Sequence, residues 1–146
     1  MQKLDLPGFA PDTCTEDDDG ILHFVLRANH TLEQNVILIQ AIDNYSARRR
    51  AIGQPVLVIA DLSKGTHFSF RTKQHAARES LRFDVDGLCY VSFHNKTNYL
   101  LLKLILRLFD PNRFHLSPTV AEARKWLFAY NTRERTANRR PPGFGL

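Results

Sequence analysis

The chain has few cysteines and no long apolar segment, and both absences limit what it can be. It contains two cysteines, Cys14 and Cys89, among 146 residues, too few for the disulfide framework of a small secreted domain. Cys89 lies in the apolar run LCYVSF, where a free thiol packs as a small hydrophobic group. No segment approaches the roughly 18 to 20 apolar residues of a membrane span, and the first residues lack the apolar core of a secretion signal. We therefore expect a soluble, cytoplasmic protein.

Motifs of nucleotide-binding, hydrolytic and metal-binding sites are also absent from the sequence. It has no GxSxG, no Walker-type GxxxxGK and no GxGxxG, the patterns that position a nucleophile or cradle a phosphate. Its six histidines show no HxxxH or HExxH spacing, so we expect no metal site. The sequence therefore predicts a protein that is not an enzyme and that carries no cofactor.

Positive charge is in excess, and its position along the chain matters more than its size. The net charge is +5, and residues 132–146 carry four arginines against one glutamate, which is +3 of that total. A nucleic-acid-binding module instead needs a basic stripe on a structured face. This distribution argues against nucleic acid as the partner.

The apolar periodic segments fall within residues 12–131, and we expect these residues to form one domain. A chain of this length can bury a core of its own without metals or disulfide bonds. Residues 1–11 are predicted to be an N-terminal extension. Residues 132–146 are predicted to be a basic disordered tail, because they show no apolar period.

The first half of the domain begins with a hairpin over residues 12–26, turning at an Asp-Gly pair. A helix is predicted to start at Thr31, where Gln34 gives the spacing of a capping box, and to continue to about Arg50. Its apolar face is predicted to contain Leu32, Val36 and Ile39. Residues 56–60 lack polar alternation, which predicts a strand covered on both faces.

The second half alternates between predicted helices and strands. Ser69 caps a second helix, residues 88–93 form a buried strand, and residues 96–109 form a third helix. A short strand at 113–116 precedes a fourth helix, for which Ser117 is the predicted cap with proline in the first turn. This order predicts an α/β fold with four helices and a mixed sheet of about five strands, the later ones parallel.

The element order, the Asp-Leu-Ser sequence that follows strand 56–60, and the Ala-x-x-Trp-Leu pattern of the last helix resemble the bacterial STAS-like proteins. These proteins are relatives of anti-sigma-factor antagonists, and their fold is compared with that of CRAL-TRIO lipid-transfer domains. The resemblance covers about residues 15–130. It implies a non-enzymatic regulatory module that docks a partner protein, such as a regulator or a kinase, through the loop after this strand and the helix that follows.

Antagonists of this kind carry an Asp-Ser-Ser-Gly type signature whose serine is phosphorylated by the partner kinase. Counted from Asp61, that signature falls on Ser69, Phe70, Arg71 and Thr72 of this chain. Phe70 takes the place of the phosphorylated serine, so we expect no phosphorylation at that position.

The loop after strand 56–60 is the candidate binding site. Asp61 is expected to organise the loop by accepting backbone N–H bonds, since no second carboxylate lies at a chemically paired spacing. Ser69 is either an N-cap or a modifiable hydroxyl. The candidate binding residues are Asp61, Ser63, Thr66, His67, Ser69 and Thr72.

The predicted helix at 96–109 is more apolar than one sheet face requires, because a helix that packs on a sheet needs only an apolar arc of about 100°. Three explanations stay open: a self-association surface for a second copy of the chain, a docking face for another protein, or one wall of a cavity for a lipid-like ligand. The third makes a lipid or apolar-ligand carrier the alternative function. The apolar residues of this face are Leu101, Leu102, Ile105, Leu108 and Phe109.

Overall fold

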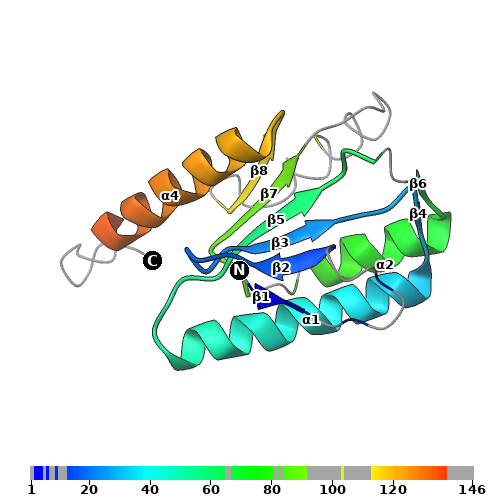
Figure 1. Cartoon of the computed structure of the whole chain (residues 1–146), viewed down its shortest axis with the longest axis horizontal. Helices are drawn as coiled ribbons and strands as arrows, with labels where there is room; N and C mark the ends of the chain where they lie inside the picture. The colour runs from blue at the N-terminus through cyan, green and yellow to red at the C-terminus, as the bar shows by residue number, and fades with distance from the viewer. Residues whose placement is uncertain are drawn as a thin grey trace.

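The centre of the protein is one six-stranded sheet with helices on both sides (Figure 1). The structure, a computed structural model, describes residues 2–4, 6, 9, 13–64, 67–80, 82, 84–91, 103 and 113–137. The sheet has the order β1-β2-β3-β5-β7-β8. Its strands are β1 (Gln2–Lys3), β2 (Cys14–Glu16), β3 (Leu22–Val25), β5 (Leu57–Asp61), β7 (Gly87–Val91) and β8 (Phe114–Ser117).

Strand direction divides the sheet into two parts. β1, β2 and β3 are antiparallel neighbours, whereas β3, β5, β7 and β8 run parallel. Helices α1 (Leu32–Ala51) and α2 (Phe70–Ser80) lie on one side of the sheet, and α4 (Val120–Ala137) lies on the other (Figure 1). The predicted α/β class, the N-terminal hairpin and the parallel later strands are therefore confirmed.

Four details differ from the sequence prediction or extend it. β1 lies within residues 1–11 and adds a sixth strand to the expected five, because it pairs with β2. The described residues contain three helices where four were predicted. The helix predicted at 96–109 lies outside the described residues apart from Lys103, which is helical. α4 continues to Ala137, beyond the boundary expected at residue 131.

A second, two-stranded sheet was not anticipated. β4 (Asn29–His30) precedes α1 and pairs in parallel with β6 (His67–Phe68), which precedes α2. Figure 1 shows both strands beside the starts of these two helices. This pairing ties the segment after β3 to the segment after β5.

The core has one apolar layer on each face of the sheet. Phe24 and Val58 pack with α1 residues such as Ile42, whereas Ile59 packs with Leu127 of α4. Every residue of β5 is buried, as expected for a strand covered on both faces. Both cysteines are free and buried, and burial raises the pKa of Cys89 to about 11.

The buried face of α1 differs from the predicted one. Val36 is 50% exposed, and the buried residues of this helix are Asn35, Leu38, Ala41, Ile42, Tyr45 and Ser46. The prediction was wrong for Val36, whereas Ile39 is half-buried and packs against the core. The run 36–39 did not distinguish them, because its apolar side chains lie about 100° apart around the helix axis and cover every direction. The capping box is confirmed: the Gln34 N–H donates to Thr31 Oγ1, and the Thr31 N–H donates to Gln34 Oε1, both at 3.1 Å.

The cap of α4 is Thr119 rather than the predicted Ser117. The N–H of Glu122 donates to Thr119 Oγ1 at 3.2 Å. Ser117 is the last residue of β8, where it pairs with Val91, and the Cys89 thiol donates to its hydroxyl at 3.3 Å. None of the helices in the described residues is both long and apolar enough to cross a lipid bilayer.

Candidate functional site

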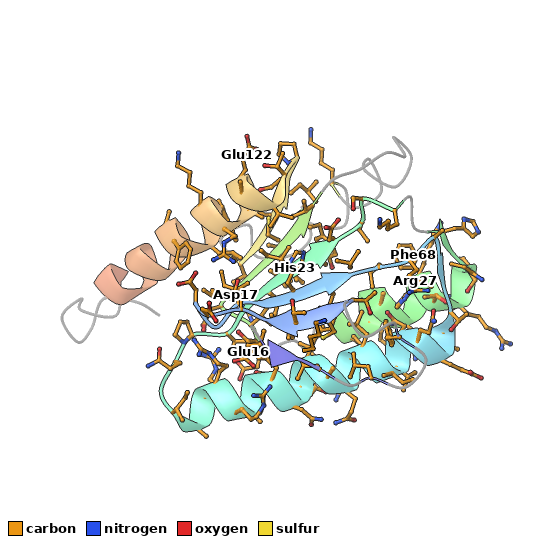
Figure 2. The ribbon with its side chains drawn as sticks, viewed as in Figure 1. Glu16, Asp17, His23, Arg27, Phe68 and Glu122 are labelled. Atoms are coloured by element: carbon orange, nitrogen blue, oxygen red, sulfur yellow. The ribbon has the colours of Figure 1, made fainter. Side chains whose placement is uncertain are left out.

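The candidate loop lies where the parallel strands end. Val25, Asp61, Val91 and Ser117 are in register on neighbouring strands, and the starts of α1 and α2 lie at the same end. We call this end the carboxyl edge and the opposite end of the parallel strands the amino edge. In Figure 2, the labelled Arg27 and Phe68 lie at the carboxyl edge, apart from Glu16 and Asp17.

Asp61 organises the start of the loop, as the sequence predicted. Its side chain is largely buried, and its Oδ1 accepts the N–H of Ser63 at 2.9 Å. Its backbone carbonyl accepts the N–H of Leu26, also at 2.9 Å. Its Oδ2 lies 3.7 Å from Nε2 of His23, too far for a hydrogen bond. Asp61 therefore holds the loop against the end of β3.

Ser69 and Thr72 form the cap of α2. The N–H of Thr72 donates to Ser69 Oγ at 3.2 Å, and the two hydroxyls are 2.8 Å apart. Thr72 is fully buried, whereas Ser69 is exposed. The Thr72 hydroxyl is thus engaged inside the protein, and a partner can reach Ser69 without unwinding the helix.

Two candidate residues of the loop remain, His67 and Thr66, and the structure describes only the first. His67 is exposed in β6, and its N–H donates to the carbonyl of Ala28 at 2.8 Å. Thr66 lies outside the described residues. The same holds for every residue of the predicted apolar docking face: Leu101, Leu102, Ile105, Leu108 and Phe109.

Phe70 is the most prominent side chain at this edge. It is the first residue of α2 and is 75% exposed, the largest value among the exposed large hydrophobic residues described. Exposing an aromatic ring forgoes about 1.5–3 kcal/mol relative to burying it. The Phe70 ring therefore remains an apolar group at this edge that the folded domain does not bury.

Cations from separate segments accompany Phe70. Arg27 follows β3, Lys64 lies in the loop after β5, and Arg71 and Lys73 lie in the first turn of α2. None of these four forms a salt bridge within the described part of the chain. We call the residues Arg27, Lys64, Phe70, Arg71 and Lys73 the Phe70 surface.

Few carboxylates oppose these cations. Within the described residues of 26–33 and 61–74, the carboxylates are Glu33 at the start of α1 and the buried Asp61. The pairing of β4 with β6 brings the segment that carries Arg27 beside the segment that leads to Phe70. The Phe70 surface is therefore basic around one apolar side chain.

A chain of hydrogen bonds beneath this surface joins β4, α1 and α2. Nε2 of the buried His30 lies 3.0 Å from Asn35 Oδ1, and Asn35 Nδ2 lies 2.7 Å from His75 Nδ1. The rings of Phe9 and Phe68 flank His30, with centroids at 6.3 and 5.6 Å. Burial lowers the pKa of His30 below its ordinary value, although the hydrogen bond to Asn35 opposes this shift.

This hydrogen-bond chain was not predicted from the sequence. Its members match no motif, and His75 is 40 positions from Asn35. The available signal was Asn35 itself, a polar residue that shares a helical face with Leu38 and Ile42. A polar residue on a buried face requires a hydrogen-bond partner.

The described residues offer little for metal binding or catalysis. They contain no group of three or more histidine, cysteine or acidic side chains that could hold a metal ion. His23 and Asp61 are their one close pair of histidine and carboxylate, and the buried Nε2 of His23 has no hydrogen-bond partner. Comparison with models of known protein families, with curated proteins and with solved structures finds no match to this chain.

Proposed function

We propose that this chain is a non-enzymatic, STAS-like regulatory module that acts by protein association, and that it binds its partner through the Phe70 surface. The observation that carries the proposal is the 75% exposure of Phe70 near cations that form no salt bridge with any residue the structure describes. The likeness to STAS-like proteins in element order supports the choice of the loop and α2 as the docking region.

The composition of the Phe70 surface suits a protein interface. Aromatic residues and arginine are enriched among the residues that contribute most to binding, and charged rims favour fast encounter. Phe70 supplies the aromatic anchor, with Arg71 beside it and Arg27 across the β4–β6 pair. A partner that covers Phe70 gains the hydrophobic contribution that the isolated domain lacks.

The His23 and Asp61 pair does not favour a hydrolytic function. A nucleophilic triad needs a serine, threonine or cysteine hydrogen-bonded to the histidine. Nε2 of His23 has no such partner among the described residues, and the group that Asp61 binds is the backbone of Ser63. The alternative function, a lipid or apolar-ligand carrier, depends on helix 96–109, which lies outside the described residues.

Affinity capture with matched variants tests the proposal. Phe70→Ser removes the anchor, and Ile52→Ser is the control because Ile52 is also an exposed apolar residue, at 66%, but lies at the end of α1 near the amino edge. We expect a partner that binds the wild-type chain and Ile52→Ser, and that binds Phe70→Ser at least tenfold more weakly when the purified pair is measured by calorimetry. Equal binding to both variants would contradict the proposal.

A further inference from the structure

We infer that the partner presents an acidic segment with one apolar side chain that covers Phe70. This inference rests on the proposed function and adds the chemistry of the partner to it. The cations come from three separate segments, because Arg27, Lys64 and Arg71 follow β3, follow β5 and begin α2. The pairing of β4 with β6 places the segment after β3 beside the segment that leads to Phe70, so the fold, and not a single charged stretch of sequence, brings these cations to one edge.

The charges in the first turn of α2 are unfavourable for the isolated domain. The N-terminus of a helix carries a partial positive charge, so acidic residues there are stabilising and cations are not. α1 follows this rule with Glu33 in its first turn and arginines in its last. α2 has no acidic residue in its first turn and has Arg71 and Lys73 instead. Carboxylates of a bound partner would relieve this repulsion.

The charge pattern favours an acidic peptide over a nucleic acid or a membrane. Single-stranded nucleic acids stack their bases on several aromatic side chains along a basic groove, but Phe70 is the one largely exposed aromatic residue at this edge among those described. A membrane-bound surface needs a wide apolar face, whereas the described residues of this edge offer one largely exposed large hydrophobic side chain, Phe70, on segments that also carry cations.

A second copy of the chain does not supply the required segment from its described residues. The most acidic stretch of the chain is the turn at residues 17–19. Arg124 of the same chain already binds both Asp17 and Asp19. A second copy would have to break these internal ion pairs before it could offer these two carboxylates to Arg27 or Arg71. The turn at residues 17–19 of a second copy is therefore a poor source of the acidic segment, and the inference is that a different protein supplies it.

Selection from a random peptide library tests the inference without knowledge of the partner. The probe is a phage-displayed library of 12-residue peptides, selected on the full chain with the Phe70→Ser variant as competitor. We expect the enriched peptides to share a net negative charge and one conserved aromatic or large aliphatic residue. Enrichment of neutral or basic peptides that still require Phe70 would overturn this inference and leave the proposed docking site intact.

Calorimetry with synthetic versions of the enriched peptides then measures how much the cations contribute to the binding affinity. Arg71→Glu should weaken binding at least tenfold, and Lys125→Glu, which reverses an exposed charge on α4 across the sheet, should leave it unchanged. Failure to select any peptide that requires Phe70 would overturn both the inference and the proposed function. A thymidine 20-mer or vesicles of anionic phospholipid that bind the chain and lose binding in Phe70→Ser would overturn both as well. Circular dichroism of each variant confirms that the fold is retained.

Discussion

At the amino edge, the charged side chains that start or surround the parallel strands bind one another. Arg48 lies 3.3 Å from Glu16, and Arg50 lies 2.9 Å from both Asp84 and Asp86. Arg124 holds the acidic turn between β2 and β3. At the carboxyl edge, Arg27, Lys64, Arg71 and Lys73 have no such partners among the described residues. Charges of the first kind hold elements together, whereas charges of the second kind belong to the surface that we propose for binding.

The aromatic residues at the two edges differ in the same way. Tyr45 is fully buried near the amino edge, and its hydroxyl donates to the carbonyls of Gly20 and Leu57. Gly20 has a φ of +80°, and a Cβ at this position would lie 2.5 Å from Nη1 of Arg49. Phe70, by contrast, is exposed at the carboxyl edge. The amino edge is therefore the structural end of the sheet, and the carboxyl edge is the end that we propose for binding.

Removing the aromatic ring at each edge should give the largest difference in the free energy of unfolding. Tyr45→Ala leaves a cavity and two carbonyls without their donor, so we expect a loss of about 3–5 kcal/mol in the free energy of unfolding. Phe70→Ala removes an exposed ring and should change stability by less than about 0.5 kcal/mol. Urea unfolding of both variants measures the difference. Comparable losses in the two variants would mean that Phe70 packs within the protein.

Removing one arginine at each edge should give a smaller difference in the free energy of unfolding. Arg50 makes paired hydrogen bonds of 2.9–3.1 Å with Asp84 and Asp86, and its side chain is 39% exposed. Because solvent screens part of this interaction, we expect Arg50→Ala to cost about 1–2 kcal/mol. Arg71→Ala should cost nothing measurable by the same urea titration. A destabilised Arg71→Ala variant would show that this cation has a structural role.

The fold was largely predictable because hydrophobic periodicity and turn chemistry are local signals. The fully apolar run 56–60 predicted a strand buried on both faces, and Thr31 with Gln34 predicted the start of α1. The buried face of α1 was not predictable, because the run 36–39 is apolar in every direction. β1 and the pair β4–β6 were missed because their strands have two residues each, too few to show a period.

The local roles of two candidate residues were predictable, whereas the binding role of the loop stays a prediction. Strand and loop order correctly located Asp61 and the cap at Ser69, which are fixed by contacts within the segment 61–72. The burial of Thr72 and the link between His30 and His75 depend on how α1 and α2 pack, and no local pattern reports that packing. That the cations near Phe70 form no salt bridge with a described residue likewise depends on which side chains the fold brings together.

Removing the cap of α2 should weaken the carboxyl edge alone. Ser69→Ala deletes the acceptor of the Thr72 N–H and leaves the buried Thr72 hydroxyl without its described partner. We expect a loss of about 1 kcal/mol, the usual contribution of an N-cap serine. Ser63→Ala is the matched control, because the hydrogen bond of Ser63 to Asp61 uses its backbone. Hydrogen exchange should rise in the first turn of α2 and stay unchanged in the β2–β3 turn. A rise in both places would show that the two edges are not independent.

Mild acid should produce the smallest loss of stability, and this loss should again arise at the carboxyl edge. Burial lowers the pKa of His30, so below its ordinary pKa of about 6.5 the unfolded chain binds a proton that the folded chain does not. The contribution of neutral His30 to stability is therefore complete above that pH and is lost as the pH falls toward the lowered value. At the amino edge, Arg50 lowers the pKa of Asp84 from 3.8, so this ion pair is unaffected between pH 5.5 and 7.5.

Thermal melting across that pH range tests this difference. We expect the melting temperature to fall by a few degrees from pH 7.5 to 5.5 in the wild-type chain and in His67→Gln, which changes an exposed histidine of β6. His30→Gln retains an amide donor toward Asn35 Oδ1 but cannot titrate, so its melting temperature should depend less on pH. Exchange rates corrected for the intrinsic effect of pH should rise in β4, β6 and the start of α2. An unchanged pH dependence in His30→Gln would mean that another group, and not the buried histidine beneath the Phe70 surface, responds to acid.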